Sequence, residues 1–136
     1  MIEYREGRDV PPEAVAQLFD TVPWARGRSP ERIAKALAAS DHVVTAWDGA
    51  RLIGIARSLS DGEWYATIWD VIVHPGYRSR GIGREIMRRM TAFYRGRGFS
   101  YVALFSVEGR EGWYEQFGYR LHPRGMRLDE SAPDAG

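Results

Sequence analysis

The sequence predicts an α/β fold with a mixed, largely antiparallel central sheet that is flanked by helices. Three observations carry this prediction. Two Asp-Gly pairs lie between short apolar runs, helix-start signals precede the first of these runs, and an Arg/Gly-rich loop separates a long apolar run from an amphipathic one. The predicted order of elements is β-α-α-β-β-β-α-β-α-β. A chain of 136 residues is long enough for one domain with one core.

The first third of the chain predicts one strand and two helices. Residues 2–5 are a strand candidate, and a Pro-Pro-Glu sequence opens a helix over 11–19. Ser29 and Pro30 start the second helix, because Ser is a preferred N-cap and Pro suits the first helical position. The loop between the two helices carries an aromatic residue, Trp24, at its tip.

The middle of the chain predicts a β-meander followed by a crossover. Asp-Gly pairs, which are strong hairpin signals, connect the apolar runs 42–47, 52–59 and 64–73. An amphipathic run over 84–95 predicts a helix, and 101–105 predicts a short strand. The crossover makes the strands on either side of this helix parallel neighbours. If this parallel strand pair is splayed at its carboxyl ends, the gap can hold a ligand.

The C-terminal part gives weaker signals. Residues 110–117 predict a short helix, and 119–122 and 126–128 predict final short strands. From residue 129 the composition becomes small and polar, so we expect a single domain over 1–128 and a disordered tail over 129–136.

Composition excludes several functional classes. The net charge of +1 gives no reason to expect a nucleic-acid partner, and the lack of Cys excludes disulfides and thiol nucleophiles. The three histidines (His42, His74 and His122) show no metal-ligand spacing, so no metal is expected. No apolar run approaches the roughly 18–20 residues of a membrane helix, and the N-terminus lacks a signal-peptide pattern. We therefore expect a cytoplasmic chain without a membrane partner.

The segment from Val73 to Gly83 is the most informative part of the sequence. A strand breaks at Pro75, crosses the Arg/Gly loop and enters a helix, so backbone N–H groups and the positive end of the helix dipole meet at one point. The glycines let a ligand approach the backbone closely, and the arginines supply charge. These features predict an anion site that suits a pyrophosphate, with a purely structural turn as the alternative.

The spacing Arg78-x-x-Gly81-x-Gly83 after Val73-x-Pro75 resembles the acyl-CoA loop of the GNAT superfamily of N-acetyltransferases. The predicted element order is also that of the GNAT fold, so the resemblance spans nearly the whole chain. It implies acetyl-CoA as co-substrate, with loop amides on the pyrophosphate and strand groups on the pantetheine arm. The implied binding residues are Ile72, Val73, Arg78, Ser79, Arg80, Gly81, Ile82, Gly83 and Arg84.

A second pattern, Trp113-Tyr114 followed by Gly118-Tyr119, resembles the aromatic motif of the same family. Attack of an amine on a thioester must expel CoA as a thiolate, and a nearby phenol with a pKa of about 10 can give it a proton. The resemblance implies that Tyr114 is this general acid. Packing of the last helix is the alternative role.

One position departs from the family pattern. Many members carry Asn or Asp seven residues before the motif tyrosine, where the side chain can hold the amide of the cofactor, but Val107 stands there in this chain. Backbone groups, Ser106 or Glu108 would then hold that part of the cofactor.

Asp70 is the predicted base that accepts the proton of the amine. It lies in an otherwise apolar run, where desolvation would raise the pKa of a carboxyl group toward neutrality. Strict strand alternation places Ile68, Asp70 and Ile72 on one face. A solvated Asp is the alternative, and Glu63 and Glu108 are the other candidate bases. Residues 66–71, 104–105 and 123–126 resemble the GNAT branch of plant plastid arylalkylamine N-acetyltransferases, and Asp70 matches an Asp of that branch.

The resemblance implies direct transfer of an acetyl group to a primary amine, either a small amine or an amine of a protein or peptide. The backbone amide of Val73 would polarise the thioester carbonyl. Trp24, Glu63 and Trp69 are the candidates for the acceptor pocket, with core packing as the alternative role of the aromatic residues. The acidic residues Asp61 and Glu63 suggest a cationic amine, with solubility of a hairpin turn as the alternative reason for their charge. The alternative function is an acyl-CoA-binding sensor without turnover. The family often forms dimers, which leaves a homodimer as one option.

Overall fold

The structure of the protein is a computed structural model, and residues 1–132 of it are described. The chain forms two compact units, Met1–Phe105 and Ser106–Gly136. No helix within residues 1–132 is long and apolar enough to cross a bilayer.

The first unit is a five-stranded sheet with helices on both faces. Its strands pair in the order β1-β2-β3-β4-β5, with β1 to β4 antiparallel and β4 parallel to β5. This mixed sheet confirms the predicted fold class. The elements of the first unit are β1 (Ile2–Glu6), α1 (Pro12–Phe19), α2 (Pro30–Ala39), β2 (Val43–Asp48), β3 (Arg51–Ser60), β4 (Tyr65–Val73), the 3₁₀ turn η1 (Pro75–Tyr77), α3 (Ile82–Tyr94) and β5 (Tyr101–Leu104). The second unit contains α4 (Glu111–Glu115).

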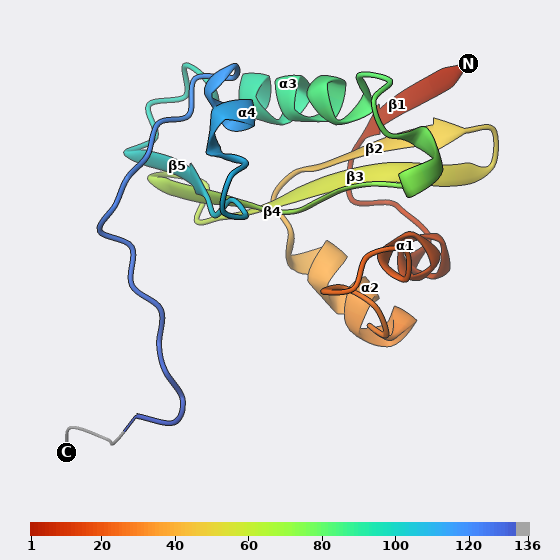
Figure 1. Cartoon of the computed structure of the whole chain (residues 1–136), viewed down its shortest axis with the longest axis horizontal. Coiled ribbons are helices and arrows are strands. Elements are labelled where there is room, and N and C mark those ends of the chain that lie inside the picture. The colour runs from red at the N-terminus through yellow and green to blue at the C-terminus, as the bar shows by residue number, and fades with distance from the viewer. Residues whose placement is uncertain (133–136) are drawn as a thin grey trace. The chain divides into compact units, whose positions relative to one another are not determined.

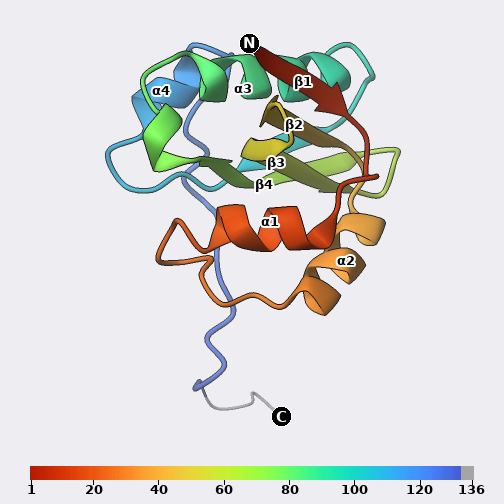
Figure 2. The same cartoon turned by 90° about the vertical axis from the view of Figure 1, so that its right-hand side faces the viewer.

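Helix α3 covers one face of the sheet, and α1 and α2 cover the other (Figure 1, Figure 2). An apolar core joins α1 and α2 to strands β2, β3 and β4, and it includes Val15, Leu18, Ile33, Leu37, Ile55 and Ile72. On the opposite face α3 lies over β2 and β3. A Cβ atom added to Gly54 of β3 would lie 2.7 Å from Cδ1 of Ile86, so the missing side chain lets α3 approach the sheet closely.

The helix-start signals act as predicted. The hydroxyl of Ser29 accepts a hydrogen bond of 3.3 Å from the backbone N–H of Arg32, and Pro30 is the first residue of α2. Helix α3 begins at Ile82, before the predicted start at residue 84. Its N-cap is Gly81, whose φ of 78° lies in the left-handed region.

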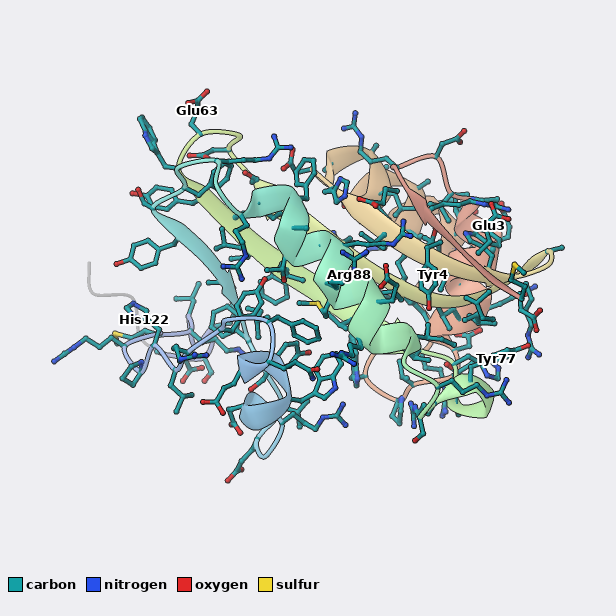
Figure 3. The ribbon with its side chains drawn as sticks, turned by 90° about the horizontal axis from the view of Figure 1, so that it is seen from above. Glu3, Tyr4, Glu63, Tyr77, Arg88 and His122 are labelled. Carbon is teal, nitrogen blue, oxygen red and sulfur yellow. The ribbon has the colours of Figure 1, made fainter. Side chains whose placement is uncertain are left out.

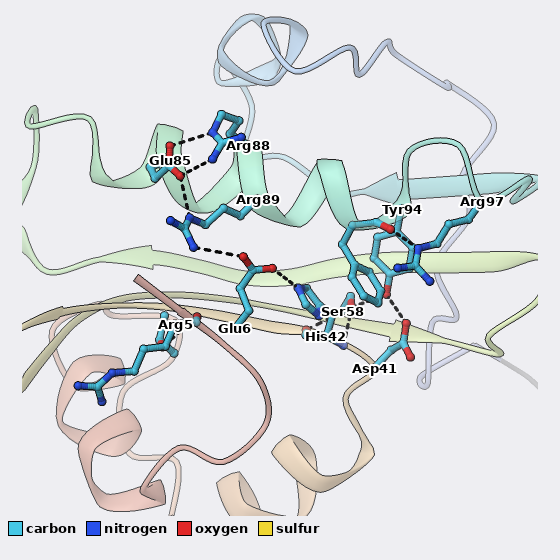
Figure 4. A network of polar contacts seen from close by, with 12 residues as sticks. Arg5, Glu6, Asp41, His42, Ser58, Glu85, Arg88, Arg89, Tyr94 and Arg97 are labelled. Carbon is cyan, nitrogen blue, oxygen red and sulfur yellow. Dashed lines mark hydrogen bonds and ion pairs between the residues drawn. The ribbon is translucent and has the colours of Figure 1, made fainter. Parts of the chain in front are cut away.

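Polar contacts fix α3 to the strands beneath it (Figure 4). The hydroxyl of Tyr94 lies 2.5 Å from the hydroxyl of Ser58 on β3 and donates to Asp41 over 2.7 Å. Burial raises the pKa of Tyr94. Arg89 donates to Glu6 of β1 over 3.2 Å. Because no buried side-chain nitrogen or oxygen within residues 1–132 lacks a partner, α3 is held by satisfied polar contacts as well as by packing.

Strand β4 contains a β-bulge at Asp70. Ile55 pairs with Ile72 and Arg57 pairs with Trp69, so two steps along β3 match three steps along β4. Asp70 has a φ of 54°, in the left-handed region that Asp tolerates better than most residues.

The bulge overturns the predicted alternation in β4. Ile68 pairs with Ser58, whose hydroxyl contacts Tyr94 of α3, so Ile68 faces α3. Ile72 belongs to the core under α1 and α2 on the other face. The prediction that Ile68, Asp70 and Ile72 share one face is therefore wrong, because an extra residue in the strand shifts the side-chain period by one.

The final strands predicted at 119–122 and 126–128 do not form, because residues 119–128 contain no strand. The segment is mostly exposed and contains Pro123, which has no N–H for a sheet ladder. The tail predicted over 129–136 lies partly outside the described residues. Within it, the N–H of Ala132 donates to the carbonyl of Asp129 and closes a turn. The single domain over 1–128 stays a prediction.

Candidate active site

The loop between η1 and α3 presents a row of backbone N–H groups. Within residues 1–132, none of the seven consecutive N–H groups from Arg78 to Arg84 has a hydrogen-bond acceptor. Ser79 has a φ of 65° and Gly81 a φ of 78°, so the chain turns sharply before α3 begins. Alternating left-handed residues of this kind form concave anion sites, and the dipole of α3 adds positive potential.

The side chains of His74 and Tyr77 stabilise the start of this loop. The ring of His74 accepts a hydrogen bond of 2.9 Å from the N–H of Gly76, and burial together with nearby Arg51 and Arg78 lowers the pKa of His74. The hydroxyl of Tyr77 donates to Asp48 at the β2–β3 turn. The contact between Tyr77 and Asp48 holds the start of the loop against β2.

The edge of β4 that faces β5 is only partly paired. The parallel pairing begins at Tyr65 and Tyr101 and ends at Ile68 and Leu104. From Trp69 to Val73, β4 has no strand partner on that side within the described residues. This stretch of β4 runs directly toward the loop, so an extended ligand could pair with the strand edge and reach the loop amides.

The carboxylate of Asp70 is held by two arginines. Arg57 donates from Nε to Oδ2 over 2.7 Å, and Arg28 donates from Nη1 to Oδ1 over 3.1 Å. The exposed fractions of the side chains are 5% for Asp70, 16% for Arg57 and 39% for Arg28. Asp70 is therefore a buried, charge-paired group, and the solvated alternative considered from the sequence does not apply.

A cavity of about 260 Å³ opens beside Asp70 on the face covered by α1 and α2. Its polar lining consists of Asp70 and three arginines, Arg28, Arg32 and Arg57. Its apolar lining consists of Val15, Phe19, Ile33, Ala36 and Leu37. The guanidinium carbon of Arg28 lies 5.1 Å from the ring centroid of Phe19, a cation–π distance that holds Arg28 over this wall.

Tyr114 lies on α4 in the second unit. Its ring meets Trp113 edge-on with centroids 4.9 Å apart, and Tyr119 edge-on at 6.5 Å. Burial raises the pKa of Tyr114, and the positive charge of Arg110 partly opposes this. The hydroxyl therefore keeps its proton at neutral and mildly alkaline pH, as a general acid must.

The three residues predicted for an acceptor pocket do not line the cavity. Trp24 is 56% exposed in the α1–α2 loop, with its ring 5.8 Å from the guanidinium carbon of Arg28. Glu63 lies in the β3–β4 turn, at the opposite end of β4 from Tyr77 (Figure 3). Trp69 is 37% exposed on β4.

The cavity arginines were missed by the sequence analysis. Arg57 carries a signal that could have found it, because it is a charge inside the apolar run of β3 and pairs with the strand that holds Asp70. Arg28 and Arg32 carry no such signal, since only the fold of the α1–α2 loop and the packing of α2 bring them to the cavity. Within residues 1–132, no three potential metal ligands cluster.

Comparison with known proteins places this geometry in a family. Residues 12–119 match the acetyltransferase (GNAT) family. The chain is 38% identical to an uncharacterised ycf52-like N-acetyltransferase of Prochlorococcus marinus, over 82% of this chain and 63% of that protein. It is 35% identical to the chloroplastic serotonin N-acetyltransferase 2 of Oryza sativa, over 84% of this chain and 58% of that protein. The chain thus spans about three fifths of the length of these curated relatives.

A solved structure supports the same family assignment. A GNAT-family acetyltransferase of Streptococcus pneumoniae superposes with a TM-score of 0.81 at 26% identity, over 97% of this chain and all of that chain. The rice relative also confirms the local likeness to the plant plastid branch. The chain therefore belongs to the GNAT family of N-acetyltransferases.

Proposed function

We propose that this chain transfers the acetyl group of acetyl-CoA directly to a primary amine, with both substrates bound at the same time. One observation carries the proposal, namely the seven N–H groups from Arg78 to Arg84 at the start of α3, which have no hydrogen-bond acceptor in the described part of the chain. A row of free amides at a helix N-terminus suits a pyrophosphate, which is an anionic part of CoA.

The residues present fit acetyl-CoA, which would supply an activated acetyl thioester. The amides of the loop would bind the pyrophosphate, and Arg78 and Arg80 would add positive charge. The unpaired edge of β4 at Ile72 and Val73 would pair with the amides of the pantetheine arm, as an additional strand does.

Two side chains would move protons in this reaction. The bound ammonium would give one proton to Asp70 and become the amine that attacks. Its nitrogen would then bond to the acetyl carbon as the carbon–sulfur bond breaks, and the second proton that the nitrogen loses would pass to water. A carboxylate has about four acceptor sites, of which Asp70 uses one on each oxygen for its arginines, so sites remain for an ammonium group. Tyr114 gives its proton to the departing sulfur.

A thermal-shift titration with CoA and acetyl-CoA, run beside a free-thiol assay over a panel of amines, tests the proposal. A ligand at a hundred-fold excess over its Kd stabilises a protein by about 2.7 kcal/mol, so binding gives a clear shift. We expect a shift with both ligands and thiol release that depends on an amine. A shift without release from any amine contradicts the transferase proposal, and no shift contradicts the pyrophosphate site.

A further inference from the structure

The cavity beside Asp70 carries more positive than negative charge. Three guanidinium groups and one carboxylate line it, a formal excess of two positive charges. The side chain of Arg32 makes no hydrogen bond or ion pair within residues 1–132. A guanidinium has five N–H donors, and Arg28 and Arg57 use only some of theirs on Asp70 and Ser40. The cavity therefore offers donors and charge to an anionic group.

Asp61 and Glu63, the acidic residues that suggested a cationic amine, do not line this cavity. The Oδ1 atom of Asp61 accepts hydrogen bonds from the backbone N–H groups of Glu63, Trp64 and Tyr65, at 2.8 to 3.0 Å. Asp61 therefore closes the β3–β4 turn, and Glu63 is part of the same turn. The cavity beside Asp70 has an excess of positive charge, whereas these two residues had suggested a negatively charged pocket.

The apolar wall and the volume of the cavity limit the size and polarity of the ligand. Its remaining wall is apolar, formed by residues of α1 and α2 such as Phe19 and Ile33. Its volume of about 260 Å³ is below the ~300–1,000 Å³ that is typical of drug-sized ligands. A small molecule with an apolar side group fits this space better than a large or a purely polar one.

We propose that the acceptor is a small amine that carries its own carboxylate, of the kind found in an amino acid with an apolar side chain. Its carboxylate would bind Arg32 and the spare N–H groups of Arg28, and its amine would lie toward Asp70. Opposite charges at the two ends of the site match the two charges of such a zwitterion. The inference rests on the proposed function, because it names the acceptor of that reaction.

Matched amine pairs test this acceptor class. The pairs are leucine with isoamylamine and phenylalanine with phenylethylamine, each differing by one carboxylate, with serotonin as a further amine without one. Thiol release at saturating acetyl-CoA gives kcat/KM for each amine. Isovalerate, a carboxylate without an amine, gives a binding readout by thermal shift. We expect the carboxylated member of each pair to be preferred by about ten-fold or more.

The variant Arg32→Gln removes a charge that makes no side-chain hydrogen bond or ion pair within residues 1–132, so the fold should persist. The variant should lower kcat/KM for leucine about ten-fold and leave kcat/KM for isoamylamine unchanged. It should also abolish the thermal shift with isovalerate. Lys35→Gln is the matched control, because it removes one positive charge from the same helix outside the cavity. It should change none of these readouts.

The outcomes separate the inference from the proposed function. Equal or better transfer to the amines without a carboxylate, unchanged in Arg32→Gln, overturns the inference and leaves the transferase intact. Failure of thiol release with every amine overturns the proposed reaction. In that case an isovalerate shift that Arg32→Gln abolishes still supports an anion-binding cavity, and the absence of that shift overturns it.

Discussion

Arg57 and Asp70 are joined by a hydrogen bond of 2.7 Å between Nε and Oδ2, across the register shift that the bulge creates between β3 and β4. The bulge places Asp70 on the face of the cavity, where only 5% of its side chain is exposed. A carboxylate at this depth depends on its partners, because an unpaired buried charge is costly.

Arg57→Met should therefore destabilise the protein by about 3 kcal/mol, because Asp70 is left with Arg28 alone. Arg28 is more exposed, so Arg28→Gln should cost about 1 kcal/mol or less. Urea unfolding of each arginine variant, of Asp70→Asn and of the two double variants gives the coupling free energy between Asp70 and each arginine. Equal coupling for the two arginines would show that burial does not set the strength of these pairs.

Gly54→Ala should destabilise the protein by about 1–3 kcal/mol, because the new Cβ would lie 2.7 Å from Cδ1 of Ile86 and 3.3 Å from Cγ2 of Ile82. Ile86→Val removes the nearer of these atoms. The double variant Gly54→Ala/Ile86→Val should therefore be more stable than the sum of the two single losses, measured by denaturant unfolding. Strict additivity would mean that the clash is relieved elsewhere.

Most of the first unit could be predicted because its signals are local. The Asp48-Gly49 pair marks the observed β2–β3 hairpin, and Ser29 caps α2 as expected. The parallel pair of β4 and β5 follows from the crossover rule. Each of these features depends on a few neighbouring residues, which the sequence shows directly.

The bulge and the cavity could not be predicted, for a different reason. Whether β4 carries an extra residue depends on its register with β3, and the apolar run gives no sign of where the register shifts. Arg28 reaches Asp70 only through the path of the α1–α2 loop, 42 positions earlier in the chain. At 119–122 and 126–128 the sequence predicted strands that do not form, because these short segments have no partner strand.

Gly81→Glu should abolish the thermal shift with CoA, because it places a negative charge and a side chain at the start of α3. It should also cost about 1–2 kcal/mol of stability, since its φ of 78° is left-handed. Gly62→Glu is the matched control, with a φ of 80° and equally open space in the β3–β4 turn. It should lose similar stability and keep the shift with CoA. Loss of the shift in both variants would attribute the effect to stability alone.

Glu85→Gln should weaken the dependence of stability on acid pH. Hydrogen bonds from Arg88 and Arg89 outweigh burial and lower the pKa of Glu85 from 4.5 to about 2. Because the folded pKa is depressed, this stabilisation is present above about pH 4.5 and is lost as the pH falls toward 2. The variant should lose about 0.5–1 kcal/mol at pH 7 and little at pH 2. Glu63→Gln, which removes an exposed carboxylate that has no ion pair within residues 1–132, is the control for a pH-independent change.

Tyr114→Phe should lower kcat at least ten-fold, toward the 10²–10⁴-fold that general acids typically contribute, while the CoA thermal shift stays unchanged. Burial raises the pKa of Tyr114, so deprotonation of its hydroxyl should lower the wild-type rate only when the pH exceeds about 10. Tyr119→Phe removes a hydroxyl from the neighbouring ring and should retain activity. A Tyr114→Phe enzyme with wild-type kcat would remove the hydroxyl from the reaction, and equal losses in both variants would assign the effect to the aromatic packing.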